Sequence, residues 1–274
     1  MPVECVLSDT LETRGNFGCA PSSARMTSHL RDDRIDDAMT LPFHVTFDRP
    51  FLVAAFEEPQ AMLSWAMTKP GFRTGRTVAW LEVRNADLPP TVDPFAFLDR
   101  RMAEAGLVDA IALMTSRDVR HHHFAQAEVE GITATCLATV GLSNGGRVGV
   151  PRSAMPSRIG TINVLVHVSS TLSEAALVET ISIATQARTV ALLDLGHLSD
   201  GHVVSGTGTD CIVAAAPARG EAERFAGLHT PIGEAVGRAV GAAITEGGRL
   251  WCRDWNASAN FSAPRHPQDV NTAS

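Results

Sequence analysis

The sequence contains no tyrosine, and aromatic side chains make up only 5% of a chain in which 45% of the residues are hydrophobic. A core built from these residues must be filled mainly by alanine, valine, leucine and isoleucine, so neighbouring backbones are expected to pack closely. With 274 residues, the chain can bury one sizeable core or two small ones. We expect one folded body over residues 41–255, between a polar, flexible leader (1–40) and a similar tail (256–274).

Clustered basic charge is also missing. The chain has 30 acidic against 23 basic residues, a formal net charge of -7, and no long run of Lys and Arg. A nucleic-acid-binding protein normally presents a clustered basic face, so no nucleic-acid partner is expected. The acidic balance mainly implies solubility.

Cysteines are few, and their spacing matches no common disulfide or metal-binding motif. There are five, an odd number, widely spaced and without a CxxC motif. This pattern argues against a disulfide framework and against a structural zinc site, so we expect reduced thiols and a cytoplasmic protein. Glu4, Asp9 and Glu12 interrupt any signal peptide, and the longest apolar runs, such as Thr161–Val168, are far too short to span a bilayer. No membrane association is expected.

Strand-like and helix-like segments alternate along the folded body. This alternation predicts an α/β fold, a layered sheet with packed helices, whose strand order does not follow from the pattern. Short apolar or alternating runs indicate strands at Phe51–Phe56, Thr77–Val83, Asp109–Met114, Ile132–Val140, Ile162–Val168, Val203–Ser205 and Cys211–Ala216. Helices are expected at Pro59–Met67, from Asp93 to Gly106, from a capping box of Thr171 and Glu174 to Gly196, and from Thr230 to Gly247.

The segment Gly206–Asp210 (GTGTD) is the most suggestive motif. Its two glycines allow a sharp turn that exposes backbone N–H groups, beside two hydroxyls and a carboxylate. N–H groups aimed at one point can stabilise an oxyanion or hold a phosphate. The motif is neither a Walker loop, because no Lys follows, nor a dinucleotide-binding fingerprint, because its glycine spacing differs. An ordinary hairpin explains the same composition.

Two further loops lie at predicted strand ends. Gly160–Asn163 enters a strand, and the amide of Asn163 offers both a donor and an acceptor to an amide substrate. Gly141–Gly146 follows the strand Ile132–Val140. Taken alone, Gly160–Asn163 is better explained as a local turn fixed by Asn163, and Gly141–Gly146 as a flexible connection.

Other reactive side chains have simpler interpretations. Three consecutive histidines at 121–123 rarely bind one ion, because adjacent side chains diverge, so we interpret them as a solvated loop. His167 and His202 could act as general bases, but their positions favour hydrogen-bonded structural roles. Cys136 falls on the apolar phase of its strand, which favours a buried, inert thiol over a nucleophile. No metal site is expected.

Taken in order, the motifs resemble the adenosylcobinamide amidohydrolase family. The resemblance covers about residues 45–245 and is strongest from 139 to 240, with Leu63–Ser64 and Met114–Thr115 as its anchors in the first part. The segments that carry it are Gly141–Asn144, Gly160–Asn163, Leu172–Glu179, Thr185–Thr189, Gly206–Asp210 and Ala226–Thr230.

The resemblance implies hydrolysis of the amide that joins a propionate arm of the corrin ring to aminopropanol. The products are adenosylcobyric acid and aminopropanol, and the reaction serves the salvage of incomplete or foreign corrinoids. The corrinoid is then a small-molecule substrate, and no cofactor is expected. An alanine-rich helix face suits an interface between copies of the chain as well as a core, so a homo-oligomer stays open.

The resemblance also suggests roles for the motif residues. Asp210 would orient or deprotonate the attacking group, and Thr209, or less readily Thr207, would attack or hold the water. The oxyanion would be bound by the N–H groups from Gly206 to Thr209 and by Asn163. The remaining substrate contacts are assigned to Asn144, Thr161, Gly206, Gly208, Gln186 and Arg188. These roles require the loops around residues 144, 163 and 210 to converge on one cleft that admits a macrocycle.

One departure from the family pattern bears on these roles. This chain has Gln186 and Arg188 where the family often has Glu and Lys. If that Glu were the general base, the substitution would argue against activity, and a non-catalytic corrinoid-binding or carrier protein is the alternative. If the two residues form a structural pair, Gln–Arg can still hydrogen-bond. Without the resemblance, a Gly/Thr loop in an α/β protein would also suit a phosphate-handling transferase.

Overall fold

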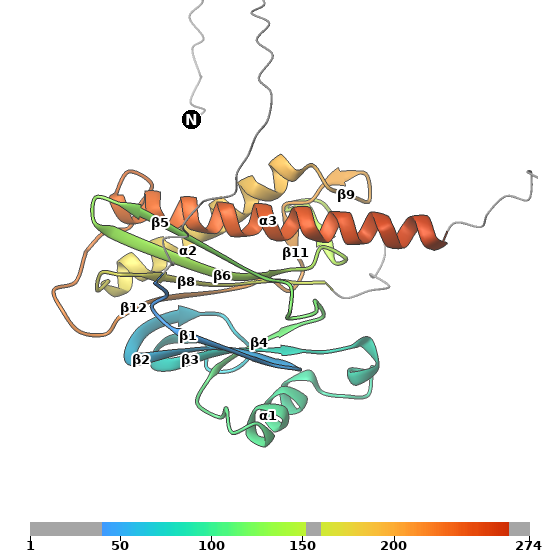
Figure 1. Cartoon of the computed structure of the whole chain (residues 1–274), viewed down its shortest axis with the longest axis horizontal. Helices are drawn as coiled ribbons and strands as arrows, with labels where there is room; N and C mark the ends of the chain where they lie inside the picture. Colours follow the sequence, from blue (N-terminus) through green and yellow to red (C-terminus); the bar gives the residue numbers. More distant parts are fainter. Residues whose placement is uncertain (1–39, 152–159, 263–274) are drawn as a thin grey trace, which may run out of the picture. The chain divides into compact units, whose positions relative to one another are not determined.

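The computed structural model describes residues 40–151 and 160–262 (Figure 1). The expected leader lies outside this range except for its last residue. Of the expected tail, residues 256–262 belong to the last helix, and the remainder lies outside the described residues.

An eight-stranded mixed sheet forms the centre of the fold, in the order β4-β3-β2-β12-β8-β6-β5, with β1 paired to β2. The pairs β12–β8 and β3–β4 are parallel, and the others are antiparallel. The strands are β1 (His44–Asp48), β2 (Phe51–Ser64), β3 (Gly71–Glu82), β4 (Ile111–Thr115), β5 (His122–Val129), β6 (Ile132–Val140), β8 (Ile162–Val168) and β12 (Cys211–Pro217). Two small ribbons pair β7 (Gly145–Gly146) with β11 (Gly206–Thr207) and β9 (Leu198–Ser199) with β10 (His202–Val203).

Within the described residues, three α-helices pack on the sheet. A short 3-10 turn (Asn85–Asp87) precedes α1 (Pro94–Glu104), whose N-cap is Asp93 as the sequence predicts. The helices α2 (Glu174–Leu195) and α3 (Pro231–Ser262) lie side by side over β8, β6 and β12. Gly196 ends α2 in the left-handed conformation, again as predicted (φ 69°).

The sheet bends over so that its two halves face each other across a shared apolar layer, and the pairing of β2 with β3 is irregular between Ala55 and Gln60. The bend places β4 near β8 and creates three apolar layers. One lies between the sheet and α2/α3, a second between the two halves of the sheet, and a third between α1 and β2–β4. Strand β8 is therefore buried on both faces, which explains its continuous apolar sequence.

The sequence-based assignment is wrong at four places, each for a physical reason. Residues Pro59–Met67 do not form a helix, because Gln60–Ser64 continue β2 and pair with both β3 and β12. The cap of α2 is Ser173, whose Oγ accepts from the N–H of Ala176, whereas Thr171 donates to the carbonyl of Arg219. His122 and His123 are half-buried and open β5 instead of lying in a solvated loop.

The fourth difference concerns Gly247, which was expected to end the last helix. Helix α3 instead continues through it to Ser262. A Cβ at Gly247 would lie 2.6 Å from Cγ2 of Val140 and 2.8 Å from Cδ2 of His123. Glycine is thus required here by close helix–sheet packing and not by a helix end, so tertiary contact outweighs its low helix propensity.

By length and composition alone, α2 could also cross a membrane. Core helices of water-soluble proteins share this property, and α2 packs one side against the sheet and α3. Its outer side exposes Val178, Val190 and Leu193.

Candidate active site

The carboxylate of Asp210, directly before β12, is the centre of the candidate site. Its side chain is only 7% exposed. Arg188 Nη1 and the N–H of Thr207 donate to Oδ2, the latter over 3.0 Å, and Thr207 Oγ1 and the N–H of Ile162 donate to Oδ1, the latter over 3.2 Å. Burial raises the pKa of Asp210 above its usual range, while the Arg188 charge and the Thr207 hydrogen bonds oppose this. Asp210 is thus both held in place and able to exchange a proton at milder pH than an exposed carboxyl.

The ion pair between Arg188 and Asp210 forms across the backbone of Gly206. A Cβ at Gly206 would lie 3.0 Å from Asp210 Oδ2 and 3.4 Å from Arg188 Cζ. Arg188 also donates from Nη2 to Thr189, while its Nε is buried without a partner among the described residues. The glycine therefore lets a helix residue reach a loop carboxylate through a space that a larger residue would fill.

Close backbone contacts bring the three predicted loops together. A Cβ at Gly160 would lie 2.6 Å from the backbone N of Ser143, and one at Gly208 would lie 3.2 Å from Nδ2 of Asn144. Asn144 is 8% exposed and lies beneath Gly208. The loops containing residues 144, 160 and 208 thus meet, as the sequence motifs suggested.

Two threonine hydroxyls form a second polar group at the start of β8 and β12. Thr209 Oγ1 lies 2.9 Å from Thr161 Oγ1 and 3.2 Å from the carbonyl oxygen of Gly160. Thr161 Oγ1 donates to the carbonyl of Thr209 over 2.7 Å. Thr209 therefore contacts a hydroxyl and a carbonyl, whereas Thr207 is the threonine that contacts the Asp210 carboxylate.

The loop Gly206–Asp210 separates two hollows, and both hollows are lined by Gly208 and Asp210. The first, which we call the apolar hollow, has a volume of about 410 Å3 and is lined largely by Trp65, Met67, Val83, Leu88, Leu113 and Met114, with Thr161, Asn163 and Thr209 at its polar side. The second, the polar hollow, has about 540 Å3 and is lined by residues including Asn144, Arg147, Thr185, Arg188, Thr189, Ser205 and Thr207. The expected single cleft is therefore two adjoining hollows with one shared wall.

Asn163 lies in the apolar hollow but is tightly held. It is 1% exposed, and its side-chain Nδ2 donates to the carbonyl of Met114 over 2.8 Å. This bond ties β8 to β4 across the bend in the sheet. The geometry gives Asn163 a structural bond in addition to the oxyanion role that the sequence suggested.

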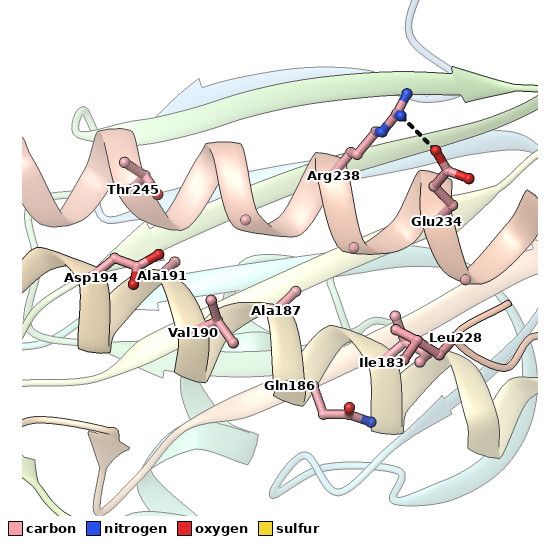
Figure 2. A pocket seen from close by; sticks show the side chains of 13 residues that line it. Ile183, Gln186, Ala187, Val190, Ala191, Asp194, Leu228, Glu234, Arg238 and Thr245 are labelled. Carbon is pink, nitrogen blue, oxygen red and sulfur yellow. Dashed lines mark ion pairs between the residues drawn. The ribbon is translucent and has the colours of Figure 1, made fainter. Parts of the chain in front are cut away.

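Gln186 lies away from Asp210. It is exposed, donates to Ser182 Oγ over 3.3 Å and lines a groove of about 430 Å3 between α2 and α3 (Figure 2). Residues two positions apart on a helix point in different directions, so Gln186 and Arg188 do not form the pair suggested by the sequence. Of these two positions, Arg188 is the one beside the carboxylate.

Two of the backbone N–H groups expected to bind an oxyanion are already engaged. The N–H of Thr207 donates to Asp210, and the N–H of Gly208 approaches the carbonyl of Asn144 at 3.4 Å. The loop is thus built around its own carboxylate instead of an open anion cradle. The hydroxyls of Thr161 and Thr209, which face the apolar hollow, are alternative donors.

The lining of the two hollows offers few groups for proton transfer. Asp210 is the one carboxylate among the described lining residues, and no histidine is present there. Cys211 also lines the apolar hollow, but burial raises the pKa of its thiol to about 12, so it is protonated at neutral pH. Asp210 is therefore the candidate proton acceptor.

The other candidate nucleophiles and bases lie elsewhere. Cys136 is fully buried in β6, as expected, and burial raises the pKa of its thiol. His167 lies between the two halves of the sheet, donates from Nε2 to Gln60 Oε1 over 3.1 Å, and has a pKa lowered by burial to about 4. Within residues 40–151 and 160–262, no three His, Cys, Asp or Glu side chains gather to hold a metal ion.

Trp65 is the main residue that sequence reasoning missed. Its Nε1 donates to the backbone carbonyl of Asp210 over 2.8 Å, and the residue is 47% exposed beside the apolar hollow. It follows the Leu63–Ser64 anchor directly, which is the only sequence signal that pointed to it.

A family model and two curated relatives match the sequence of this chain. The family model described as adenosylcobinamide amidohydrolase (CbiZ) matches residues 36–255. An adenosylcobinamide amidohydrolase of Halobacterium salinarum is 28% identical over 160 residues, covering 54% of this chain and 64% of that protein. An uncharacterized protein of Methanocaldococcus jannaschii is 33% identical over 91 residues, covering 32% and 35% of the two chains. The chain thus aligns with less than two thirds of the length of either relative.

Among solved structures, a β-aminopeptidase of Burkholderia aligns with 14% sequence identity and a TM-score of 0.40. The alignment covers 78% of this chain and 87% of the aminopeptidase chain.

Proposed function

The chain belongs to the adenosylcobinamide amidohydrolase family, and on that premise we propose that it hydrolyses the aminopropanol amide of adenosylcobinamide. The products are adenosylcobyric acid and aminopropanol, and the reaction serves cobamide salvage.

One observation carries the assignment of this reaction to the Asp210 region. Segments far apart in the sequence meet at this single carboxyl-bearing residue, and each contributes a direct hydrogen bond. Trp65, just after β2, donates to the backbone carbonyl of Asp210, and Ile162, at the start of β8, donates to its carboxylate. Arg188 on α2 and Thr207 in the Gly206–Asp210 loop also donate to the carboxylate. Three of these segments are the ones that carry the family motifs. A structural turn alone does not need such convergence beside two hollows.

In the proposed reaction, Asp210 accepts the proton of the attacking oxygen. This oxygen belongs to a water beside the carboxylate or to Thr207, whose hydroxyl already donates to Asp210. The same proton then passes to the leaving nitrogen as the C–N bond breaks, so Asp210 returns to its starting state. With a Thr207 ester as intermediate, a water then attacks in the same way and releases the acid. General acid–base catalysis of this kind contributes about 10²–10⁴ in rate.

The developing oxyanion needs donors on the other side of the carbonyl. The paired hydroxyls of Thr161 and Thr209 line the apolar hollow within the same loop cluster, and each can reorient its hydrogen. A single oxyanion donor is worth about 3–4 kcal/mol in other hydrolases. Arg188 does not act on substrate in this scheme; it holds the Asp210 carboxylate and lowers the cost of burying its charge.

The proposal is tested by incubating the purified protein with adenosylcobinamide and separating the products by chromatography. Formation of adenosylcobyric acid together with an equal amount of aminopropanol is expected. Tight corrinoid binding without either product would contradict hydrolysis and favour the carrier alternative.

A further inference from the structure

The two hollows beside Asp210 differ in chemical character, and this difference bears on how a substrate lies across the loop. The lining of the apolar hollow is mostly aliphatic, sulfur-containing and aromatic, whereas the Asn144 amide, four hydroxyls and two arginines line the polar hollow. An amide hydrolase must bind the acyl part and the amine part of its substrate on opposite sides of the attacked carbonyl. Here the loop carrying Asp210 provides both sides.

The substrate halves differ in the same sense. The corrin ring is large, flat and carbon-rich, whereas aminopropanol is small and carries a hydroxyl beside its nitrogen. An apolar pocket binds the corrin ring favourably because binding buries much of the carbon surface of the ring. Hydrogen-bonding side chains suit the hydroxyl and nitrogen of aminopropanol. A volume of about 410 Å3 is within the range of small-molecule sites and accepts one edge of a macrocycle.

Trp65 is placed to contact that macrocycle. Nearly half of the residue is exposed, although exposed tryptophan is unusual, and its ring is fixed because Nε1–H is bonded to the Asp210 backbone. A fixed aromatic surface binds a flat ligand without losing rotamer freedom. The same bond sets the ring at a fixed place relative to the reacting carboxylate.

Resting on the proposed function, we propose that the apolar hollow binds the corrin side of the substrate, with Trp65 packed against the ring, and that the polar hollow receives the aminopropanol arm. In this arrangement, Trp65 determines specificity for corrinoids over small amides that contain the same scissile bond. It is a binding residue and takes no part in proton transfer.

The test compares two substrates: adenosylcobinamide and N-propionyl-1-amino-2-propanol, which keeps the amide and lacks the ring. Trp65→Ala is expected to lower kcat/KM for the corrinoid, mainly through KM, by about 10–100-fold more than kcat/KM for the small amide, because the small amide is affected only by loss of the Nε1 bond to Asp210. Trp65→Phe, which keeps a ring, is expected to lose less. The matched control is Phe225→Ala, which removes another exposed aromatic side chain (64% exposed) away from both hollows.

A binding measurement separates this inference from the proposed reaction. Calorimetry with adenosylcobyric acid should show at least tenfold weaker binding to Trp65→Ala than to the wild type, with aminopropanol binding unchanged. Equal losses on both substrates, or unaltered affinity for the acid, would overturn the role of Trp65. A wild type that binds the acid through Trp65 but forms no product would overturn the hydrolase proposal alone. A wild type that does neither would overturn both.

Discussion

Arg188 and Asp210 form an ion pair in which both side chains are largely buried, at 12% and 7% exposure. The pair joins α2 to the loop before β12, so it links the packing of a helix on the sheet to the position of the candidate proton acceptor. Removing one partner of such a pair leaves an uncompensated charge in the interior.

Replacing Arg188 should therefore reduce stability. Arg188→Met is expected to lower the free energy of unfolding by about 3–5 kcal/mol, and Arg188→Lys by less, because the charge remains while the forked geometry is lost. Urea unfolding at neutral pH measures both. The control Arg238→Met breaks an exposed pair with Glu234 on α3 and should change stability by no more than about 0.5 kcal/mol. A change at Arg188 no larger than this control would show that the pair contributes little.

Replacing Asp210 should remove the proton acceptor. Asp210→Asn is expected to lower kcat for adenosylcobinamide by about 10²–10⁴-fold while the protein still binds corrinoid. Steady-state kinetics, with circular dichroism to check folding, measures the effect. Asp194→Asn, at an exposed position that lines the α2–α3 groove, should retain full activity. Normal turnover by a folded Asp210→Asn variant would remove this residue from the mechanism.

The pH dependence of turnover should report the environment of Asp210. The acceptor must be ionised, so activity rises as pH increases through its folded-state pKa, which burial places above the ordinary value of 3.8. Arg188 opposes that increase, so Arg188→Met should move the acidic limb of the pH–rate profile to higher pH. A limb that stays at the same pH in this variant would show that another group titrates.

His167 should make stability depend on mildly acidic pH. Its pKa falls from 6.5 to about 4 on burial, so the folded state resists protonation that the unfolded chain accepts. The free energy of unfolding should then be highest above pH 6.5 and decrease as pH falls from 6.5 to about 4, by on the order of 3 kcal/mol in total. Urea unfolding between these limits should show a weaker pH dependence in His167→Gln, whereas the exposed-site control His44→Gln should keep that of the wild type. Equal slopes in all three proteins would contradict the assignment.

Gly160 should be needed for assembly of the site. An added Cβ meets the backbone N of Ser143 at 2.6 Å and that of Asn144 at 2.9 Å, so Gly160→Ala must push the two loops apart. We expect a loss of about 1–3 kcal/mol and a larger loss of turnover. Gly241→Ala is the matched control, because its Cβ meets nothing within 4 Å and helix propensity favours alanine by about 1 kcal/mol. In thermal unfolding, Gly160→Ala should lower the melting temperature, whereas Gly241→Ala should keep or raise it. In activity assays, only Gly160→Ala should lose turnover.

Much of the framework is readable from the sequence because local patterns determine it. The buried run Ile162–Val168 is strand β8 with the predicted bounds, and Asp93–Pro94 begins α1. The pattern fails where distant contacts decide. Gln60–Ser64 form a strand because two neighbouring strands pair with them, and Gly247 stays helical because Val140 and His123 leave no space for a side chain.

The candidate site was predictable in its motifs and not in its arrangement. The loops around Asn144, Gly160 and Asp210 do meet. That Gly206–Asp210 divides two hollows depends on the pairing of β2 with β12, which brings Trp65 beside Asp210, and on the approach of β4 to β8, and no local pattern encodes either. Gln186 and Arg188 point in different directions because they are two positions apart on α2. Which of the two faces Asp210 depends on how α2 packs on the sheet.

The position of Asp210 immediately before β12 has a consequence for how such a chain can change in length during evolution. β12 pairs in parallel with β8 and antiparallel with β2, so its register is fixed from both sides. Side chains alternate between the faces of a sheet, so one residue gained or lost between Gly206 and Cys211 would turn the carboxylate away from Arg188. The loop after Pro217 lies at the opposite end of this strand, so a change of its length leaves the register of Asp210 against β8 and β2 unaltered.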